Sequence, residues 1–383
     1  MSVTAAKGFT AAGIAAGIKE SGGPDLALVV NAGPRLAAAG VFTSNRVKAA
    51  PVLWSEQVLK GGTVGAVVLN SGGANACTGP KGFQDTHATA EKAAEVLGGN
   101  AGEVAVASTG LIGLPLPMDK LLPGIERAAA ELSPHGGEKA AIAIKTTDTV
   151  HKTAVAGGDG WSVGGMAKGA GMLAPGLATM LVVLTTDADV DGPVLDRALR
   201  AATRTTFDRV DSDGCMSTND TVLLLASGAS GVVPGEAEFA EAVRTVCADL
   251  ARQLIGDAEG ASKDIRIEVV NAATEDDAVE VGRSIARNNL LKCAIHGEDP
   301  NWGRVLSAIG TTSAVFEPDE LNVAINGVWV CKKGSVGEDR DLVDMRYREV
   351  TITADLAAGG ESAVIWANDL TADYVHENSA YSS

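Results

Sequence analysis

The pattern of apolar positions in the first third of the chain indicates short strands separated by glycine-rich turns. Continuous apolar runs bounded by turn residues are typical of buried strands. Three such runs occur early in the sequence: LALVVNAG (26–33), GAVVLN (65–70) and GEVAVAS (102–108). Residues 118–132 differ, because Leu121, Ile125 and Ala129 recur there at helical spacing. We therefore expect several strands and one helix in this region.

The middle of the chain combines apolar strands with helices. LATMLVVLTTDADV (177–190) and VLLLAS (222–227) are predicted to be buried strands. Asp191 and Pro193 are typical of the start of a helix, where proline is tolerated in the first turn. Residues 236–255 carry apolar side chains at helical spacing and predict an amphipathic helix.

The last third again favours strands. IRIEVVNA (265–272) alternates as a strand does, and Thr274 followed by Glu-Asp-Asp predicts a helix start of the capping-box kind. Asn326-Gly327 between two apolar runs predicts a two-residue hairpin. Two further strands are expected in VTITADL (350–356) and SAVIWAND (362–369).

The mixed order of these elements bears on the fold class. Strands dominate both halves and do not alternate regularly with helices, which favours an α+β layered sandwich over a doubly wound sheet. The 383 residues suit one large domain or two ordinary ones. We expect a main domain over approximately residues 1–280 and a smaller C-terminal domain over approximately residues 281–383.

Composition narrows the classes of partner and compartment. The net charge of −17 opposes binding to nucleic acid, and no run of eighteen or more apolar residues indicates a membrane span. Five cysteines without a CxxC pair indicate reduced thiols in a cytoplasm and no zinc site. The N-terminal segment has no basic region followed by a long apolar run, so a signal peptide is not expected.

One glycine-rich stretch has the spacing of a dinucleotide-binding fingerprint. Gly169, Gly171 and Ala174 fit G-x-G-x-x-A, a pattern that should open a helix directly after the first strand. Pro175 and Gly176 would break such a helix, and the segment lies in the middle of the chain. We therefore do not expect a dinucleotide site here.

The sequence also gives only weak evidence for a calcium site, a histidine metal site or a serine-nucleophile site. Asp211, Asp213 and Gly214 have the look of a calcium loop, but Arg209 would occupy the first ligand position, where a carboxylate is required. The five histidines lack metal-ligand spacing, and no G-x-S-x-G elbow is present, although a Ser-His-Asp triad stays open at this point. Thr179 precedes an apolar strand, which by itself gives it only a structural role.

The run from Lys168 to Leu181 changes the interpretation of Thr179. KGAGMLAPGLATML resembles the self-processing site of the bifunctional arginine-biosynthesis family of ornithine (glutamate N-) acetyltransferases. Further stretches typical of this family follow in order and cover essentially the whole chain: Lys7-Gly8-Phe9, NSGGANACTG (70–79), STGLIG (108–113), TTDT (146–149), DAEGASK (257–263), HGEDPNWGR (296–304) and the C-terminal residues 374–383.

The resemblance implies a precursor that cuts itself between Ala178 and Thr179, giving an α chain (1–178) and a β chain (179–383). Cleavage would free an α-amine on the same residue as the nucleophilic hydroxyl. Such an amine has a pKa of about 7.7–8, so at neutral pH part of it can act as a base. Thr179 would thus be both nucleophile and base, and no histidine is needed.

The resemblance also implies the other site residues. Thr109 and Gly110 would form the oxyanion hole. Substrate contacts would come from Thr146 or Thr147 (the motif leaves the choice open by one place) and from Lys168, Thr179, Glu259, Asn378 and Ser383. The last residue is usually threonine in the family, and serine keeps the hydroxyl.

The implied activity is a ping-pong acetyl transfer from N2-acetyl-L-ornithine to L-glutamate, with an extension to acetyl-CoA as donor in a bifunctional member. The implied fold is an αββα sandwich resembling N-terminal nucleophile hydrolases, with a smaller C-terminal α/β domain. We further expect a cytoplasmic α2β2 heterotetramer without metal or organic cofactor. A self-processing aminopeptidase or amidohydrolase of related fold is the alternative.

Overall fold

The computed structural model describes residues 2–174 and 180–380 of the chain. These residues form two compact units. The first unit comprises residues 2–174, 180–208 and 215–257, and the second comprises residues 209–214 and 258–380. The sequence analysis placed a domain boundary near residue 280. In the structure, the main segment of the second unit begins at residue 258, shortly after the end of α6 (Glu236–Gly256).

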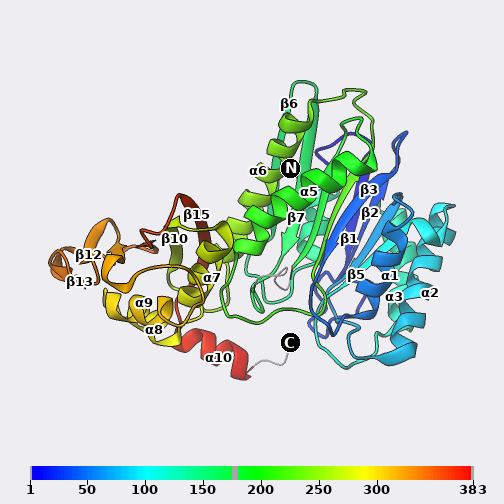
Figure 1. Ribbon diagram of the computed structural model, residues 1–383. Coiled ribbons are helices and arrows are strands. Elements are labelled where there is room, and N and C mark those ends of the chain that lie inside the picture. The colour runs from blue at the N-terminus through cyan, green and yellow to red at the C-terminus, as the bar shows by residue number, and fades with distance from the viewer. Residues whose placement is uncertain (1, 175–179, 381–383) are drawn as a thin grey trace. The chain divides into compact units, whose positions relative to one another are not determined.

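Two sheets make up the centre of the first unit (Figure 1). One is four-stranded in the order β1-β2-β4-β5, and the other is five-stranded in the order β3-β9-β8-β7-β6. The strands are β1 (Phe9–Ile14), β2 (Leu26–Asn31), β3 (Ala37–Phe42), β4 (Ala66–Asn70), β5 (Val104–Ser108), β6 (Lys152–Gly158), β7 (Trp161–Lys168), β8 (Leu181–Thr186) and β9 (Thr221–Ala226).

Helices α2 (Gly79–Leu97) and α3 (Met118–Ala130) cover the outer face of the first sheet, and α5 (Gly192–Thr205) and α6 cover that of the second (Figure 1). The unit also contains α1 (Ala50–Leu59) and α4 (Gly137–Ala143), and the alanines of α4 belong to the core between the two sheets. Short 3-10 helices occupy Ala101–Glu103, Phe207–Arg209, Pro318–Glu320 and Arg340–Leu342.

The core explains why so many strands have continuous apolar sequences. Val67 and Leu69 of β4 belong to the cluster between the two sheets, whereas Val68 of the same strand packs toward α2 and α3. A strand with apolar neighbours on both faces has no position left for the polar half of an alternating pattern. The same holds for β2, β5, β8 and β9, and this is why the apolar runs predicted these strands.

The outer face of the second sheet packs against α6. Gly165 of β7 leaves room for this helix, because a Cβ there would lie 2.9 Å from Val246 and 3.0 Å from Leu250. The first unit is therefore an αββα sandwich, and the α+β fold class expected from the sequence is confirmed. Segment 161–168, for which the sequence analysis predicted no element, is the buried strand β7.

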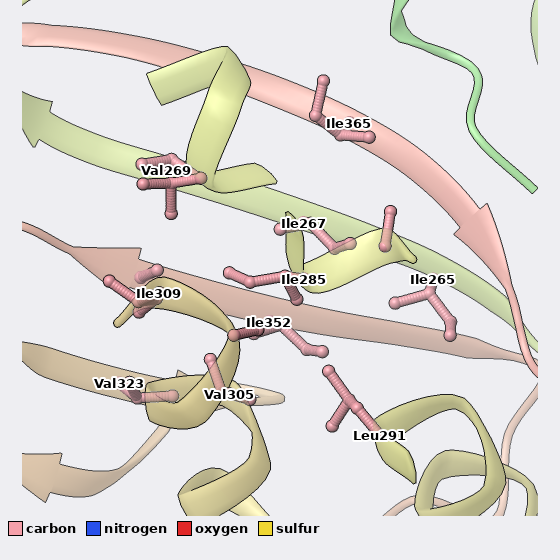
Figure 2. Packing of buried hydrophobic residues seen from close by; sticks show 14 of the residues in the cluster. Ile265, Ile267, Val269, Ile285, Leu291, Val305, Ile309, Val323, Ile352 and Ile365 are labelled. Carbon is pink, nitrogen blue, oxygen red and sulfur yellow. The ribbon is translucent and has the colours of Figure 1, made fainter. Parts of the chain in front are cut away.

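The second unit is a six-stranded sheet packed against helices. Its order is β13-β12-β11-β14-β10-β15, and Figure 2 shows the aliphatic core between this sheet and its helices. The elements are β10 (Asp264–Ala272), α7 (Glu275–Ala286), α8 (Asn289–His296), α9 (Trp302–Ile309), β11 (Asn322–Ile325), β12 (Val328–Lys332), β13 (Ser335–Val336), β14 (Glu349–Asp355), β15 (Glu361–Asn368) and α10 (Ala372–Ala380).

Two local signals of the second unit are confirmed. Thr274 caps α7, since its Oγ1 accepts a hydrogen bond of 3.0 Å from the Asp277 N–H. Asn326 (φ +47°) and Gly327 (φ +84°) form the two-residue turn between β11 and β12. Both have the positive φ that a type I′ turn requires, which is why this dipeptide predicted the hairpin.

Candidate active site

A polar cluster forms where the parallel strands β4 and β5 end. Asn70 and Ser108 are the last residues of these strands and lie opposite each other. The Ser108 hydroxyl donates to Asn70 Oδ1 at 2.6 Å, and Asn70 Nδ2 donates to the Gly73 carbonyl at 2.9 Å. These bonds hold the glycine-rich loop after β4 beside Thr109.

Gly110 fits this loop because it has no side chain. Its φ is +129°, and a Cβ would lie only 2.7 Å from the Gly73 nitrogen. In the part of the chain that the structure describes, no backbone or side-chain acceptor takes the Gly110 N–H.

Thr109 and Lys168 meet directly. Both are buried, and Lys168 Nζ donates a hydrogen bond of 3.3 Å to Thr109 Oγ1. Lys168 is the last residue of β7, and the antiparallel register places it opposite Leu181 of β8. Two residues predicted separately from the sequence are therefore brought together at the start of the strand that follows Thr179.

A buried carboxylate organises the segment around Lys168. Asp148 Oδ1 accepts hydrogen bonds of 2.7 Å from Lys152 Nζ and from the Gly169 N–H, and Oδ2 accepts one of 3.0 Å from the Thr146 N–H. Lys152 is also buried and pairs with Asp257 at 2.5 Å. Asp148 thus ties the expected substrate residue Thr146 to the backbone beside Lys168.

The charge state of Asp148 follows from its neighbours. Burial alone would raise the pKa of this carboxyl, but the Lys168 and Lys152 ammonium groups and the Gly169 N–H hold it well below its usual range. The group is therefore a carboxylate at neutral pH, surrounded by two buried cations.

Met180 begins the described chain after the expected cut. Its N–H donates to Asp220 Oδ1 at 3.0 Å, and its carbonyl accepts from the Thr221 N–H at 3.1 Å. Asn219 extends this connection, because its Nδ2 donates to the Ala74 and Ser108 carbonyls at 2.6 and 2.8 Å. The start of β9 and the two residues before it are thus bonded to Met180, Ala74 and Ser108.

The remaining predicted residues fall into two groups. Ala178, Thr179 and Ser383 lie outside the described residues. Glu259 and Asn378 belong to the second unit, where Asn378 Nδ2 donates to Glu259 Oε2 at 3.0 Å. That contact joins two residues 119 positions apart in sequence, both expected to contact substrate.

Sequence reasoning did not single out Asp148, Lys152, Asn219 and Asp220. Only Asp148 had a signal, since it stands inside the TTDT motif. The others are polar residues at the ends of apolar strands, a position that usually means a solvated turn. Their burial depends on the packing of several strand ends together.

The calcium-like loop weighed from the sequence makes other contacts in the described part of the chain. Asp211 of the calcium-like loop instead accepts a hydrogen bond of 2.8 Å from Arg287 Nε. Among the described residues, no group of three or more His, Cys, Asp or Glu side chains could hold a metal ion. No helix in residues 2–174 and 180–380 is long and apolar enough to cross a membrane.

A Ser-His-Asp arrangement does occur in the second unit, but not in catalytic order. Ser262 Oγ and Asp369 Oδ2 both contact His296 Nδ1, at 3.1 and 2.9 Å, and they also bond to each other. In a catalytic triad the carboxylate and the hydroxyl use different ring nitrogens. Because both bind the same nitrogen here, His296 is not placed to activate Ser262.

The αββα sandwich, with buried Lys168 at the end of β7 and Thr109 directly after β5, has an α+β fold that resembles N-terminal nucleophile hydrolases. Residues 10–383 match the ArgJ family, and the chain belongs to that family. It is 87% identical over 383 residues to an arginine biosynthesis bifunctional protein ArgJ from Streptomyces avermitilis, with both chains fully covered.

The chain is also similar to more distant proteins. The ArgJ protein of Thermobifida fusca is 64% identical over 383 residues, again with both chains fully covered. A solved structure of ornithine acetyltransferase from Mycobacterium tuberculosis, in complex with ornithine, is 60% identical. The match covers 47% of this chain and 96% of that chain, with a TM-score of 0.45.

Proposed function

We propose that this protein is a self-processing acetyltransferase that moves an acetyl group from N2-acetyl-L-ornithine to L-glutamate through an acetyl-Thr179 intermediate. The observation that carries the proposal is the meeting of Thr109, Gly110 and Lys168 beside the start of β8. These groups suit acyl transfer, and Thr179, the proposed nucleophile, is two residues before Leu181 in the sequence.

Self-cleavage creates the nucleophile. The Thr179 hydroxyl oxygen attacks the Ala178 carbonyl carbon, the bond from that carbon to the Thr179 nitrogen breaks, and the hydroxyl proton passes to the nitrogen, which gives an ester and a free amine. Water then hydrolyses the ester, which leaves residues 1–178 with a carboxylate and residues 179–383 with an N-terminal threonine. The freed amine can take the hydroxyl proton in later turnovers.

The oxyanion hole is assigned to Thr109 and Gly110. Because Thr109 Oγ1 accepts a hydrogen bond from Lys168, its own proton is free to point at another acceptor. The nearby ammonium also polarises this hydroxyl, which strengthens it as a donor. Together with the Gly110 N–H it would stabilise the negative oxygen of the tetrahedral intermediate.

Substrate recognition is assigned to charged and polar groups that suit amino acids. Lys168 supplies a cation for a carboxylate, and Glu259 supplies an anion for an amine. Thr146, Asn378 and Ser383 supply hydrogen bonds. Acetylornithine and glutamate would bind in turn, because one acetyl-enzyme serves as product of the first half-reaction and reactant of the second.

The bifunctional names of the relatives support a second activity, in which acetyl-CoA acetylates Thr179 directly. We also propose an α2β2 assembly of processed chains in the cytoplasm. An aminopeptidase of related fold is the less favoured alternative, because the family match covers nearly the whole chain.

Intact-protein mass spectrometry with N-terminal sequencing tests the proposal. We expect two fragments, one beginning Thr-Met-Leu-Val, and a β chain that gains an acetyl group when acetylornithine is added without glutamate. Rapid release of free acetate under the same conditions would favour a hydrolase. A single uncut chain after prolonged incubation, or a Thr179→Ala variant that still cuts, would contradict the mechanism.

A further inference from the structure

Lys152 is a buried lysine outside the groups assigned to acetyl transfer. It is the first residue of β6, and its side chain has no exposed surface. Its Nζ donates to Asp148 Oδ1 at 2.7 Å and to Asp257 Oδ2 at 2.5 Å. The two carboxylates that share this ammonium group are themselves buried, with side-chain exposures of 0% and 7%. Three charges are costly to bury together, so the arrangement needs a physical reason.

The two carboxylates hold the loop of residues 146–150, named here the Thr146 loop. Asp148 accepts the Thr146 N–H at 3.0 Å. Asp257 accepts the Thr149 N–H at 3.1 Å and also the hydroxyl of that residue. Both ends of the loop are therefore anchored to carboxylates that one ammonium group joins.

The same network reaches the end of β7. Asp148 Oδ1 also accepts the Gly169 N–H at 2.7 Å, and Gly169 directly follows Lys168. The Lys168 and Lys152 charges both hold the pKa of Asp148 well below its usual range. Thr146 and Lys168 therefore depend on one carboxylate, whose charge Lys152 helps to balance.

We propose that Lys152 is a positioning residue of the substrate site: its ammonium group links Asp148 to Asp257 and so holds the loop between these anchors in place. This inference rests on the proposed function, which assigns Thr146 and Lys168 to substrate contacts. In the processed enzyme the link would also join the two chains, because Asp148 and Lys152 precede the expected cut and Asp257 follows it.

Loss of the ammonium group should have a distinctive electrostatic effect. In Lys152→Met, which keeps a long side chain, two buried carboxylates lie close together without the cation between them. Like charges raise the pKa of such a pair, although Lys168 and Lys19 also act on Asp148 and reduce the rise. When the pH rises through this raised pKa, both carboxylates become charged and repel each other, which displaces the Thr146 loop.

Steady-state kinetics of acetyl transfer, measured per cut chain between about pH 5 and about pH 9, test the proposal. For Lys152→Met we expect KM for acetylornithine to rise about 10²-fold near pH 8, with a smaller change in kcat, because misplaced binding groups weaken the ground state and the transition state alike. The rise should shrink as the pH falls through the raised pKa. A partly unfolded sample would instead lower the apparent kcat and leave KM unchanged.

The double variant Lys152→Met/Asp257→Asn removes the repulsion together with the link. We expect its KM to be about 10-fold above that of the wild type at every pH tested, because the hydrogen bonds to a charged group are lost. This variant also serves if Lys152→Met does not fold, since neutral groups can replace a buried ion pair with little loss of stability. A wild-type KM in the double variant would contradict the proposal.

Lys92 supplies the matched control. Its Nζ also joins two carboxylates, those of Glu95 at 3.0 Å and Glu126 at 2.6 Å, but these carboxylates are exposed on α2 and α3. Water screens their charges, so Lys92→Met should keep the wild-type KM and its pH dependence.

The outcomes separate this inference from the proposed function. If the wild type does not transfer acetyl from acetylornithine to glutamate, or if Lys168→Met keeps the wild-type KM, the proposed function fails. If the wild type transfers acetyl and Lys168→Met raises KM, but Lys152→Met does not, then Lys152 does not position the substrate site. A raised KM in Lys152→Met that is the same at every pH would contradict the link between the two carboxylates.

Discussion

At the residue scale, the candidate site depends on two neighbouring residues, Thr109 and Gly110, whose close contacts restrict which side chain can stand there. Gly110 packs against the Gly73 backbone at a distance that excludes a Cβ. Thr109 offers a hydroxyl whose oxygen is already engaged by Lys168. Small substitutions at these two positions therefore test the role of each residue in acetyl transfer.

The Gly110→Ala variant tests the close packing of the loop. The new methyl group would lie 2.7 Å from the Gly73 nitrogen, and φ would stay at +129°, so the loop must move and displace the Gly110 N–H. We expect kcat for acetyl transfer to fall by about 10²–10³. Gly113→Ala is the control, because Gly113 also has positive φ (+88°) but nothing within 4 Å of its Cβ position. Equal losses in both variants would mean that strain alone is responsible.

The Thr109 hydroxyl is tested by the pair Thr109→Val and Thr109→Ser. Valine has the shape of threonine without the donor and should lower kcat by about 10²–10³. Serine keeps the donor and should restore most of the activity. Steady-state kinetics on the cut protein would measure this, and full activity in the valine variant would exclude the hydroxyl from the oxyanion hole.

At the element scale, the ends of strands from different sheets are held together by buried polar side chains. Asn219 donates to carbonyls of two loops, and Asp148 joins the segment after α4 to the end of β7. Such bonds are strong because the surroundings are dry, and they are costly to break on one side only.

Asp148→Asn should reveal this dependence through pH. The folded pKa of Asp148 is depressed, so the carboxylate stabilises the fold above the unfolded pKa of about 3.9, and this stabilisation is lost as the pH falls through the lower folded pKa. We expect the variant to lose about 3–5 kcal/mol at pH 7, with the difference from wild type shrinking below about pH 4.

Urea denaturation between about pH 3 and about pH 8 would measure this difference, because the range extends below the unfolded pKa of about 3.9. Asp344→Asn is the control, since the pKa of that exposed carboxyl is also lowered, to about 2, by its bond to Arg346. It should change stability little, because water replaces a surface ion pair. A pH-independent difference for Asp148→Asn would show that its charge is not what stabilises the fold.

At the scale of the whole molecule, two units have separate cores. Ile352 belongs to the core of the second unit (Figure 2), and Val183 belongs to the core between the sheets of the first. All described contacts of Met180, Thr109 and Lys168 given above are made within the first unit.

The self-cleaving step should therefore tolerate damage to the second core. Ile352→Ala should lower the free energy of unfolding by about 2–5 kcal/mol and leave the rate of cutting at 178/179 unchanged. Val183→Ala, in β8 itself, should both destabilise the protein and slow the cut. Calorimetry and fragment masses measure the two effects, and a slow cut in Ile352→Ala would contradict this independence.

The sequence by itself determined the α+β class, most strands of both units, the α7 cap and the β11–β12 hairpin. These features depend on local periodicity and turn chemistry, so Asn326-Gly327 and the run 222–227 carry them without help from distant residues. Ordered motifs over the whole chain also identified the family. The site residues Thr109, Gly110 and Lys168 came from that resemblance and not from spacing.

Only the tertiary structure decided that Thr109 and Lys168, 59 positions apart, share a hydrogen bond, and that Asp148, Lys152 and Asp220 are buried. It also showed that the glycines of segment 161–168 belong to the strand β7, whose Gly165 admits α6. The physical reason is common to all of these. Burial and pKa depend on which strand ends and helices meet in space, and no short window of sequence contains that information.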